Sequence, residues 1–89
     1  MSSLRPSIRS ELLTELPTLE GRAVGSVVRL AGVSGGSRRT MHLMSLGLRV
    51  GETVVVTHTR SRGVVLASAA GRVAVGAEMA RHIRIEEVG

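Results

Sequence analysis

Glu78 and His82 have the side-chain types and the spacing of a pair of metal ligands. Four residues apart on a helical turn they would share a face, where one carboxylate and one imidazole could bind a divalent transition metal. Two ligands are too few for a stable site, so His42, His58 or a second copy of the chain, in a metal-bridged homodimer, would have to complete the set. The alternative is a surface pair that binds no metal.

The segment SGGSRRTMH, residues 34–42, has a composition suited to an anion. Backbone N–H groups at the start of a helix, together with Arg38 and Arg39, could bind a phosphate or the carboxylates of an acidic protein partner. The segment lacks the glycine spacing and the lysine of a Walker loop, so it gives no support for nucleotide hydrolysis. The alternative is a flexible loop in which Ser37 is the N-cap of the helix.

The remaining histidines form no catalytic constellation. His42 is expected on the polar face of its helix near Arg38, and His58 at the end of the strand face formed by Val54 and Val56, at the rim of the fold. No nucleophile, base and orienting acid occur at positions typical of a triad, and the chain has no cysteine. The sequence therefore favours a protein that is not an enzyme.

All basic residues of the chain are arginines, and all acidic residues are glutamates. In 89 residues the formal net charge is +5, and Phe, Trp and Tyr are absent. A surface for phosphate, anionic lipid or an acidic protein would explain the excess charge, and so would arginines scattered over a solvated face. Without aromatic side chains, stacking of unpaired bases and binding of polyproline peptides lose most of their support.

Length and cysteine content further limit the classes of protein to which this chain can belong. A chain of 89 residues fits one domain with a single modest core. The absence of cysteine excludes a disulfide framework and a cysteine-based zinc site. The first residues, MSSLRPSIRSELL, lack an apolar run long enough for a signal peptide or a membrane span, so we expect a cytoplasmic protein without membrane insertion.

Hydrophobic spacing predicts the elements that would position these residues. Helical spacing predicts a short helix or lead-in over residues 7–16, which ends at Pro17, and a second helix over residues 38–46. Residues 76–82 have the composition of one helical turn. Alternating or β-branched runs predict five short strands, over residues 23–30, 53–59, 64–69, 73–75 and 83–88.

The stretch HLMSLGLRVGETVVV, residues 42–56, changes from helical to strand spacing. We expect the helix to bury Met44 together with its leucines and to end at Gly47 in a left-handed C-cap, which costs glycine little. Met41 and Leu48 fall at the edge of the buried arc, where they either cover the core or form an exposed docking patch.

Five short strands in so few residues would leave long unpaired edges in a flat sheet. A curled, nearly closed barrel avoids these edges, so the expected fold class is mostly β. We expect a lead-in over residues 1–15 and one barrel domain over residues 16–89.

This order of elements resembles the FeoA family, small SH3-like barrels associated with bacterial ferrous-iron uptake. The resemblance covers about residues 16–88 and is carried by VVRLAGVSGG, by the corner HLMSLGLRVGETVVV and by the tail VLASAAGRVAVGAEMARHIRIEE. His42 and Val50 stand where the family commonly has a basic residue and a proline. Arg60-Ser61-Arg62-Gly63 replaces a loop that is often Pro-Leu-Gly-Asp-Pro, and Gly76 stands where an arginine is common.

The resemblance implies a five-stranded SH3-like barrel with one short helix between the first two strands and a helical turn before the last. It also implies a non-catalytic accessory protein, with no required cofactor, that acts at the cytoplasmic side of a GTP-hydrolysing, FeoB-like permease for ferrous iron. We expect the partner contacts to come from Arg38, Arg39, Met41, His42 and Leu48. The rival hypothesis is a basic barrel that binds RNA or a ribosomal surface through phosphate contacts.

Overall fold

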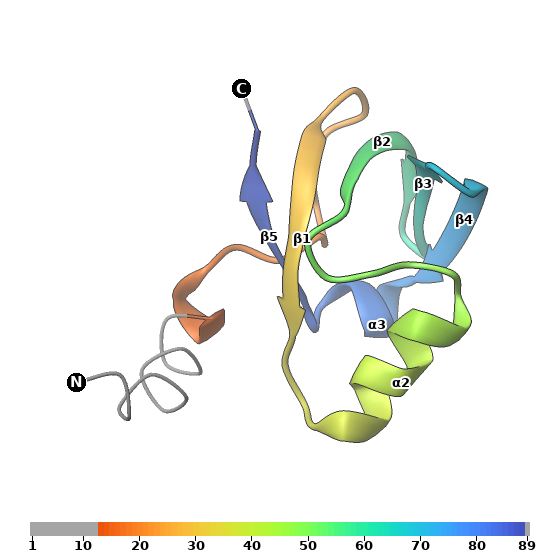
Figure 1. The fold of residues 1–89 in the computed structure, drawn as a ribbon. Helices are drawn as coiled ribbons and strands as arrows, with labels where there is room; N and C mark the ends of the chain where they lie inside the picture. Colours follow the sequence, from red (N-terminus) through yellow and green to blue (C-terminus); the bar gives the residue numbers. More distant parts are fainter. Residues whose placement is uncertain (1–12, 89) are drawn as a thin grey trace.

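Five antiparallel strands form one sheet in the order β4-β3-β2-β1-β5 (Figure 1). The computed structural model describes residues 13–88. Its elements are β1 (Val27–Val33), α2 (Ser37–Ser45), β2 (Thr53–Arg60), β3 (Gly63–Ser68), β4 (Gly71–Gly76), α3 (Ala77–Ala80) and β5 (Ile83–Glu87). The curled sheet, with one helix between its first two strands and a helical turn before its last, confirms the predicted mostly β, SH3-like barrel.

The core is built from aliphatic side chains that alternate with exposed ones along the strands. Because no aromatic residue is available, many small side chains must fill the space that a few large rings would occupy. The buried hydrophobic residues are Leu19, Val28, Leu30, Leu43, Leu48, Val54, Val56, Val64, Leu66, Val75, Met79, Ala80, Ile83 and Ile85.

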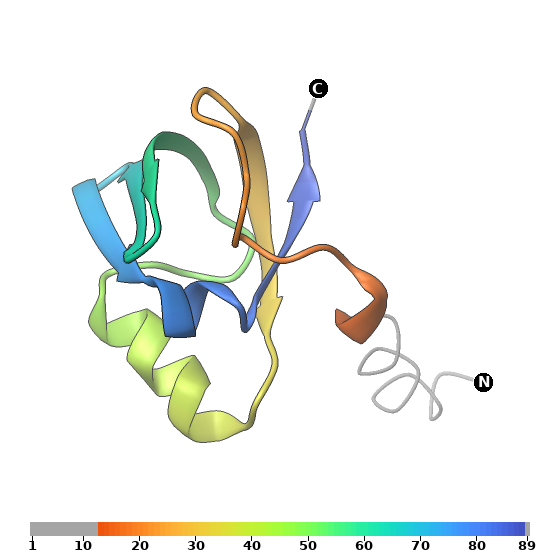
Figure 2. The ribbon, with the colours of Figure 1, turned by 180° about the vertical axis from the view of Figure 1, so that it is seen from behind.

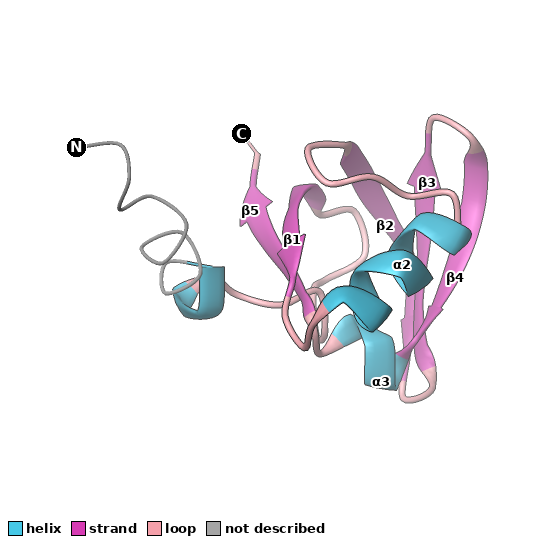
Figure 3. Ribbon diagram, turned by 60° about the horizontal axis from the view of Figure 1, so that its bottom comes forward, coloured by secondary structure: helices cyan, strands magenta, loops and turns pink. Residues whose placement is uncertain are grey.

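Both helices lie at the same end of the curled sheet, as the views from the front, from behind and from below show (Figures 1, 2 and 3). Leu43 of α2 and Met79 of α3 are buried in the core cluster. α3 contacts β3 and β4, whereas α2 contacts β1. The two helices therefore cover one end of the barrel and bring the loop before α2 close to the turn after α3.

The corner after α2 is a Schellman motif, and it explains the change of hydrophobic spacing there. Gly47 has a φ of 87° and donates its N–H to the Met44 carbonyl at 2.9 Å. The Leu48 N–H donates to the Leu43 carbonyl at 3.3 Å, and both leucines are fully buried. The predicted left-handed C-cap is confirmed, and Leu48 is the apolar residue that turns back into the core beneath the helix.

The chain after this corner forms backbone hydrogen bonds with β1. Gly51 donates its N–H to the Leu30 carbonyl at 2.7 Å, and the Leu30 N–H donates to the Glu52 carbonyl at 2.9 Å. The Glu52 carboxylate accepts the backbone N–H groups of Arg49 and Ala69 at 3.1 and 3.4 Å. β2 thus starts beside β1 in a fixed register.

Several predicted element boundaries near β1 and α2 were wrong. β1 begins at Val27 and not at residue 23, because Gly25 has a φ of 94° and lies in a turn that the Ser26 N–H closes on the Ala23 carbonyl. α2 begins at Ser37 with Gly36 as its N-cap, and no side chain of the described residues caps it, so the predicted N-cap role of Ser37 is wrong. Of the predicted helix over residues 7–16, residues 7–12 lie outside the described part, and residues 13–15 are helical.

His58 lies on the outer face of the sheet and not on the predicted face of Val54 and Val56. The register of β2 against β3 shifts between Val56, which pairs with buried Leu66, and His58, which pairs with Val65. One extra residue at a β-bulge reverses the face on which the following side chains lie. The hydroxyl of the intervening Thr57 donates to the Val65 carbonyl at 3.1 Å.

Replacing Gly47 by alanine is expected to lower the free energy of unfolding by about 1–2 kcal/mol. The loss comes from the left-handed conformation alone, since a Cβ at this position would meet no atom within 4 Å. Urea unfolding followed by circular dichroism measures it. Gly76→Ala is the matched control, because Gly76 has a φ of −65° and equally open surroundings. Equal unfolding midpoints for the two variants would contradict a conformational requirement at Gly47.

Candidate functional site

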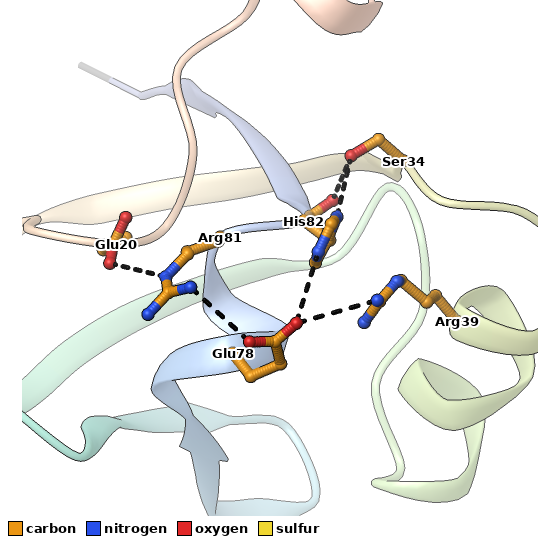
Figure 4. A network of polar contacts seen from close by, with 6 residues as sticks. All are labelled: Glu20, Ser34, Arg39, Glu78, Arg81 and His82. Carbon is orange, nitrogen blue, oxygen red and sulfur yellow. Dashed lines mark hydrogen bonds and ion pairs between the residues drawn. The ribbon is translucent and has the colours of Figure 1, made fainter.

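A cluster of polar side chains joins the two helices at the covered end of the barrel (Figure 4). At its centre is Glu78 of α3, whose side chain is 68% exposed. Its carboxylate lies 3.7 Å from Nη2 of Arg39, 3.5 Å from Nη1 of Arg81 and 3.8 Å from Nε2 of His82. The second partner of Arg81 is Glu20, whose Oε2 accepts from Nε at 3.2 Å. Three basic groups therefore surround one carboxylate.

Ser34 connects the loop before α2 to the turn after α3. Its N–H donates to the His82 carbonyl at 2.8 Å, and its Oγ lies 3.3 Å from the same oxygen and 3.5 Å from Nδ1 of His82. We predicted that backbone N–H groups of this loop could bind an anion, but the N–H of Ser34 already donates a hydrogen bond within the protein. This contact fixes where α2 starts relative to α3.

Glu78 and His82 share a face, as their spacing predicted. In the described structure, however, no third side chain that could bind a metal lies next to them. Across residues 13–88, no group of three or more histidine, cysteine, aspartate or glutamate side chains is placed to hold a metal ion. His42 and His58 do not join the pair. The carboxylate of Glu78 also faces two guanidinium groups, which would compete with a cation. Metal binding by Glu78 and His82 stays a prediction.

The outer surface of α2 presents an apolar pair flanked by basic groups. Met41 and Met44 are 68% and 63% exposed, and Arg38 and His42 are exposed beside them in the helix. Residues three and four apart on a helix are neighbours on its surface. We call the set Arg38, Met41, His42 and Met44 the α2 face.

Two predictions about this surface were wrong. Leu48 is fully buried, so it cannot be part of an exposed docking patch. Met44 was expected in the core and is exposed instead. The sequence contained a sign of this: a helix turns about 100° per residue, so Met44 and Leu46 lie about 160° apart around the helix, on nearly opposite sides. The same geometry groups Met44 with Met41.

Arg39 differs from Arg38 in its surroundings. Its side chain is 34% exposed and pairs with Glu78, and it lies over Gly35, where a Cβ would come within 2.5 Å of the Arg39 Cδ. Glycine at this position leaves the space that the arginine needs. Arg39 therefore connects α2 to α3, whereas Arg38 is exposed to solvent.

Comparison with known proteins gives a family match and several similar folds. The family model of the FeoA domain matches residues 16–87. A crystal structure of an iron uptake regulatory protein (FeoA) superposes with a TM-score of 0.73 at 20% identity, covering 82% of this chain and 97% of that one. An NMR structure of a FeoA-like protein from Clostridium acetobutylicum gives 0.72 at 16% identity, covering 83% and 88%.

Longer regulators contain a similar barrel. A manganese-dependent transcriptional repressor superposes with a TM-score of 0.74 at 17% identity, covering 82% of this chain and 41% of that one. At these identities the structural matches show the fold alone. Comparison with curated protein sequences gave no match. Within residues 13–88, no helix has the length and apolar character needed to cross a membrane.

Replacing Glu78 by glutamine is expected to lower the free energy of unfolding by less than about 1 kcal/mol. The ion pairs of Glu78 are solvent-exposed, so water and salt replace most of what they contribute. Thermal and urea unfolding at low and high salt provide the measurement. Leu43→Ala, which removes a fully buried side chain, is the reference and should cost about 2–5 kcal/mol. A loss at Glu78 comparable to that reference would show that the cluster holds the two helices together.

Proposed function

The chain belongs to the FeoA family, and from this premise we propose that it is a non-catalytic accessory protein of ferrous-iron uptake. It acts in the cytoplasm and binds the cytoplasmic side of a GTP-hydrolysing, FeoB-like permease. The observation that carries the proposal is the family match over residues 16–87. The similar crystal structure of an iron uptake regulatory protein, which this chain covers almost completely, supports it.

The α2 face is the surface that we assign to this partner. Methionine side chains are flexible and polarizable, so Met41 and Met44 can adapt to an apolar surface of another protein. Arg38 and His42 add positive or polar groups next to them, which would favour acidic residues at the edge of the contact. Leu43, which lies between the two methionines in sequence, is fully buried, and Met41 and Met44 therefore lie on the outer side of the helix.

Arg39 has an indirect part in this surface. Its guanidinium lies 3.7 Å from the Glu78 carboxylate, so it faces α3 and is less available to a partner. Reversing its charge would place two carboxylates side by side, so a loss of binding in such a variant would mix partner contact with local repulsion. A test of the α2 face therefore has to leave Arg39 in place.

The Arg38→Glu variant and the Met41→Ser/Met44→Ser double variant are each expected to weaken binding to the permease's cytoplasmic GTPase region by about tenfold. The permease is taken from the same organism, and affinity is measured by biolayer interferometry. All substituted side chains are exposed, so the circular dichroism spectrum should not change.

Arg49→Glu is the matched control for this experiment. Arg49 is exposed and lies outside the α2 face, and the variant carries the same change in charge as Arg38→Glu. Equal affinities of all variants and the wild-type chain would remove the α2 face from the proposal. Absence of binding by the folded wild-type chain would remove the permease as the partner.

A further inference from the structure

A groove on the outer face of β2, β3 and β4 has a volume of about 510 Å³ and is formed by residues from all three strands. Two rows of paired residues cross it. In one row Arg60 pairs with Gly63 and Gly63 with Gly76, and in the next His58 pairs with Val65 and Val65 with Ala74. Directly opposite residues in antiparallel strands have their side chains on the same face. In both rows the long polar side chain is on β2, whereas the residues on β3 and β4 are small or aliphatic.

The groove exists because several backbone positions carry little or no side chain. A Cβ at Gly63 would clash with the carbonyl oxygen of Val75, so the close pairing of β3 with β4 requires glycine there. Gly76 is different, since its φ of −65° suits any residue and a Cβ would meet no atom within 4 Å. The space above Gly76 is left open by the choice of residue and not by a backbone constraint.

The sides of the groove are basic. His58, Arg60, Arg62 and Arg72 line it, and no acidic residue among residues 13–88 does. In the described part of the chain, the side chains of Arg60, Arg62 and Arg72 have no hydrogen bond or ion pair. Most other described arginines pair with a glutamate, as Arg22, Arg29, Arg39 and Arg81 do. Three unpaired guanidinium groups around one apolar floor leave a strong positive potential without an internal partner.

We propose that this groove binds an acidic peptide segment of a partner protein, with an aliphatic side chain over Val65, Ala74 and Gly76 and flanking carboxylates paired to Arg60, Arg62 and Arg72. Guanidinium groups bind carboxylates with two parallel hydrogen bonds, and the aliphatic floor matches an apolar side chain. The groove lies on other elements than the α2 face, so this inference goes beyond the proposed function and does not depend on it.

The same observations disfavour a membrane or a nucleic acid as the occupant. In the part of the chain that the structure describes, none of the large exposed hydrophobic side chains, such as Val24, Met41 or Val50, lines the groove, so these offer nothing that would insert between lipids. The chain has no Phe, Tyr or Trp on which a base could stack. The arginines at the sides could bind phosphate, but the apolar floor offers a sugar-phosphate backbone no hydrogen bond.

The experiment titrates the full ¹⁵N-labelled chain with a capped peptide, Glu-Glu-Leu-Glu-Glu, up to about millimolar concentration and follows the amide resonances. We expect shifts concentrated at Val65, Ala74 and Gly76, which weaken as salt is added. The matched peptide Lys-Lys-Leu-Lys-Lys should cause none. Absence of shifts with the acidic peptide, or equal shifts with both peptides, would overturn the proposal.

Two variants test the two parts of the groove separately. Arg60→Glu/Arg72→Glu reverses the charge at its sides, and Gly76→Leu fills its floor at a position whose backbone accepts any residue. Each should weaken binding of the acidic peptide at least about tenfold. Arg49→Glu, outside the groove, should leave the affinity unchanged. Normal binding by both groove variants would overturn the assignment.

Two further probes distinguish other anions. Oligouridylate and phosphatidylglycerol vesicles are titrated under the same conditions. If either probe shifts the groove resonances of Val65, Ala74 and Gly76 more strongly than the acidic peptide does, the peptide proposal is wrong and the groove binds phosphate groups. Weaker or absent effects of both probes are the expected result.

Discussion

The turn at Gly47 is the constraint on which the arrangement of this barrel depends. It ends α2, returns Leu48 to the core under Leu43, and leads the chain to the point where Gly51 and Glu52 bond to β1. A positive φ is available to glycine at little cost, whereas other residues would strain the same turn. A few residues around this turn therefore determine both where α2 ends over the barrel and how β2 is aligned with β1.

An aliphatic core has a consequence for the outside of the molecule. Aliphatic side chains form the core, so the surfaces to which we assign binding consist of residues that the core does not use. These residues gather at two places, the α2 face and the groove on the outer face of β2, β3 and β4. The first combines methionines with basic groups on a helix, and the second combines arginines with a floor of small residues.

The groove also coincides with positions at which this chain differs from the usual FeoA pattern. The segment Arg60-Ser61-Arg62-Gly63 and Gly76 are far apart in sequence, yet Gly63 and Gly76 pair directly and the Arg62 carbonyl accepts the Ala77 N–H at 2.9 Å. Two residues of the α2 face, His42 and Met44, lie in the corner that carries the family resemblance. Since His42 also stands where the family commonly has a basic residue, both surfaces include positions at which this chain differs from the usual pattern.

The sequence by itself determined the mostly β class, the order of elements and the glycine corner, because hydrophobic spacing and positive φ are local properties. It also placed Glu78 next to His82, since four residues span one helical turn. Only the tertiary structure decided that His58 faces outward, because a bulge depends on how β2 pairs with β3. The same holds for three other features, namely the ion pair of Arg39 with Glu78, the burial of Leu48 and the groove. All three arise where distant segments pack together, and local spacing carries no information about such contacts.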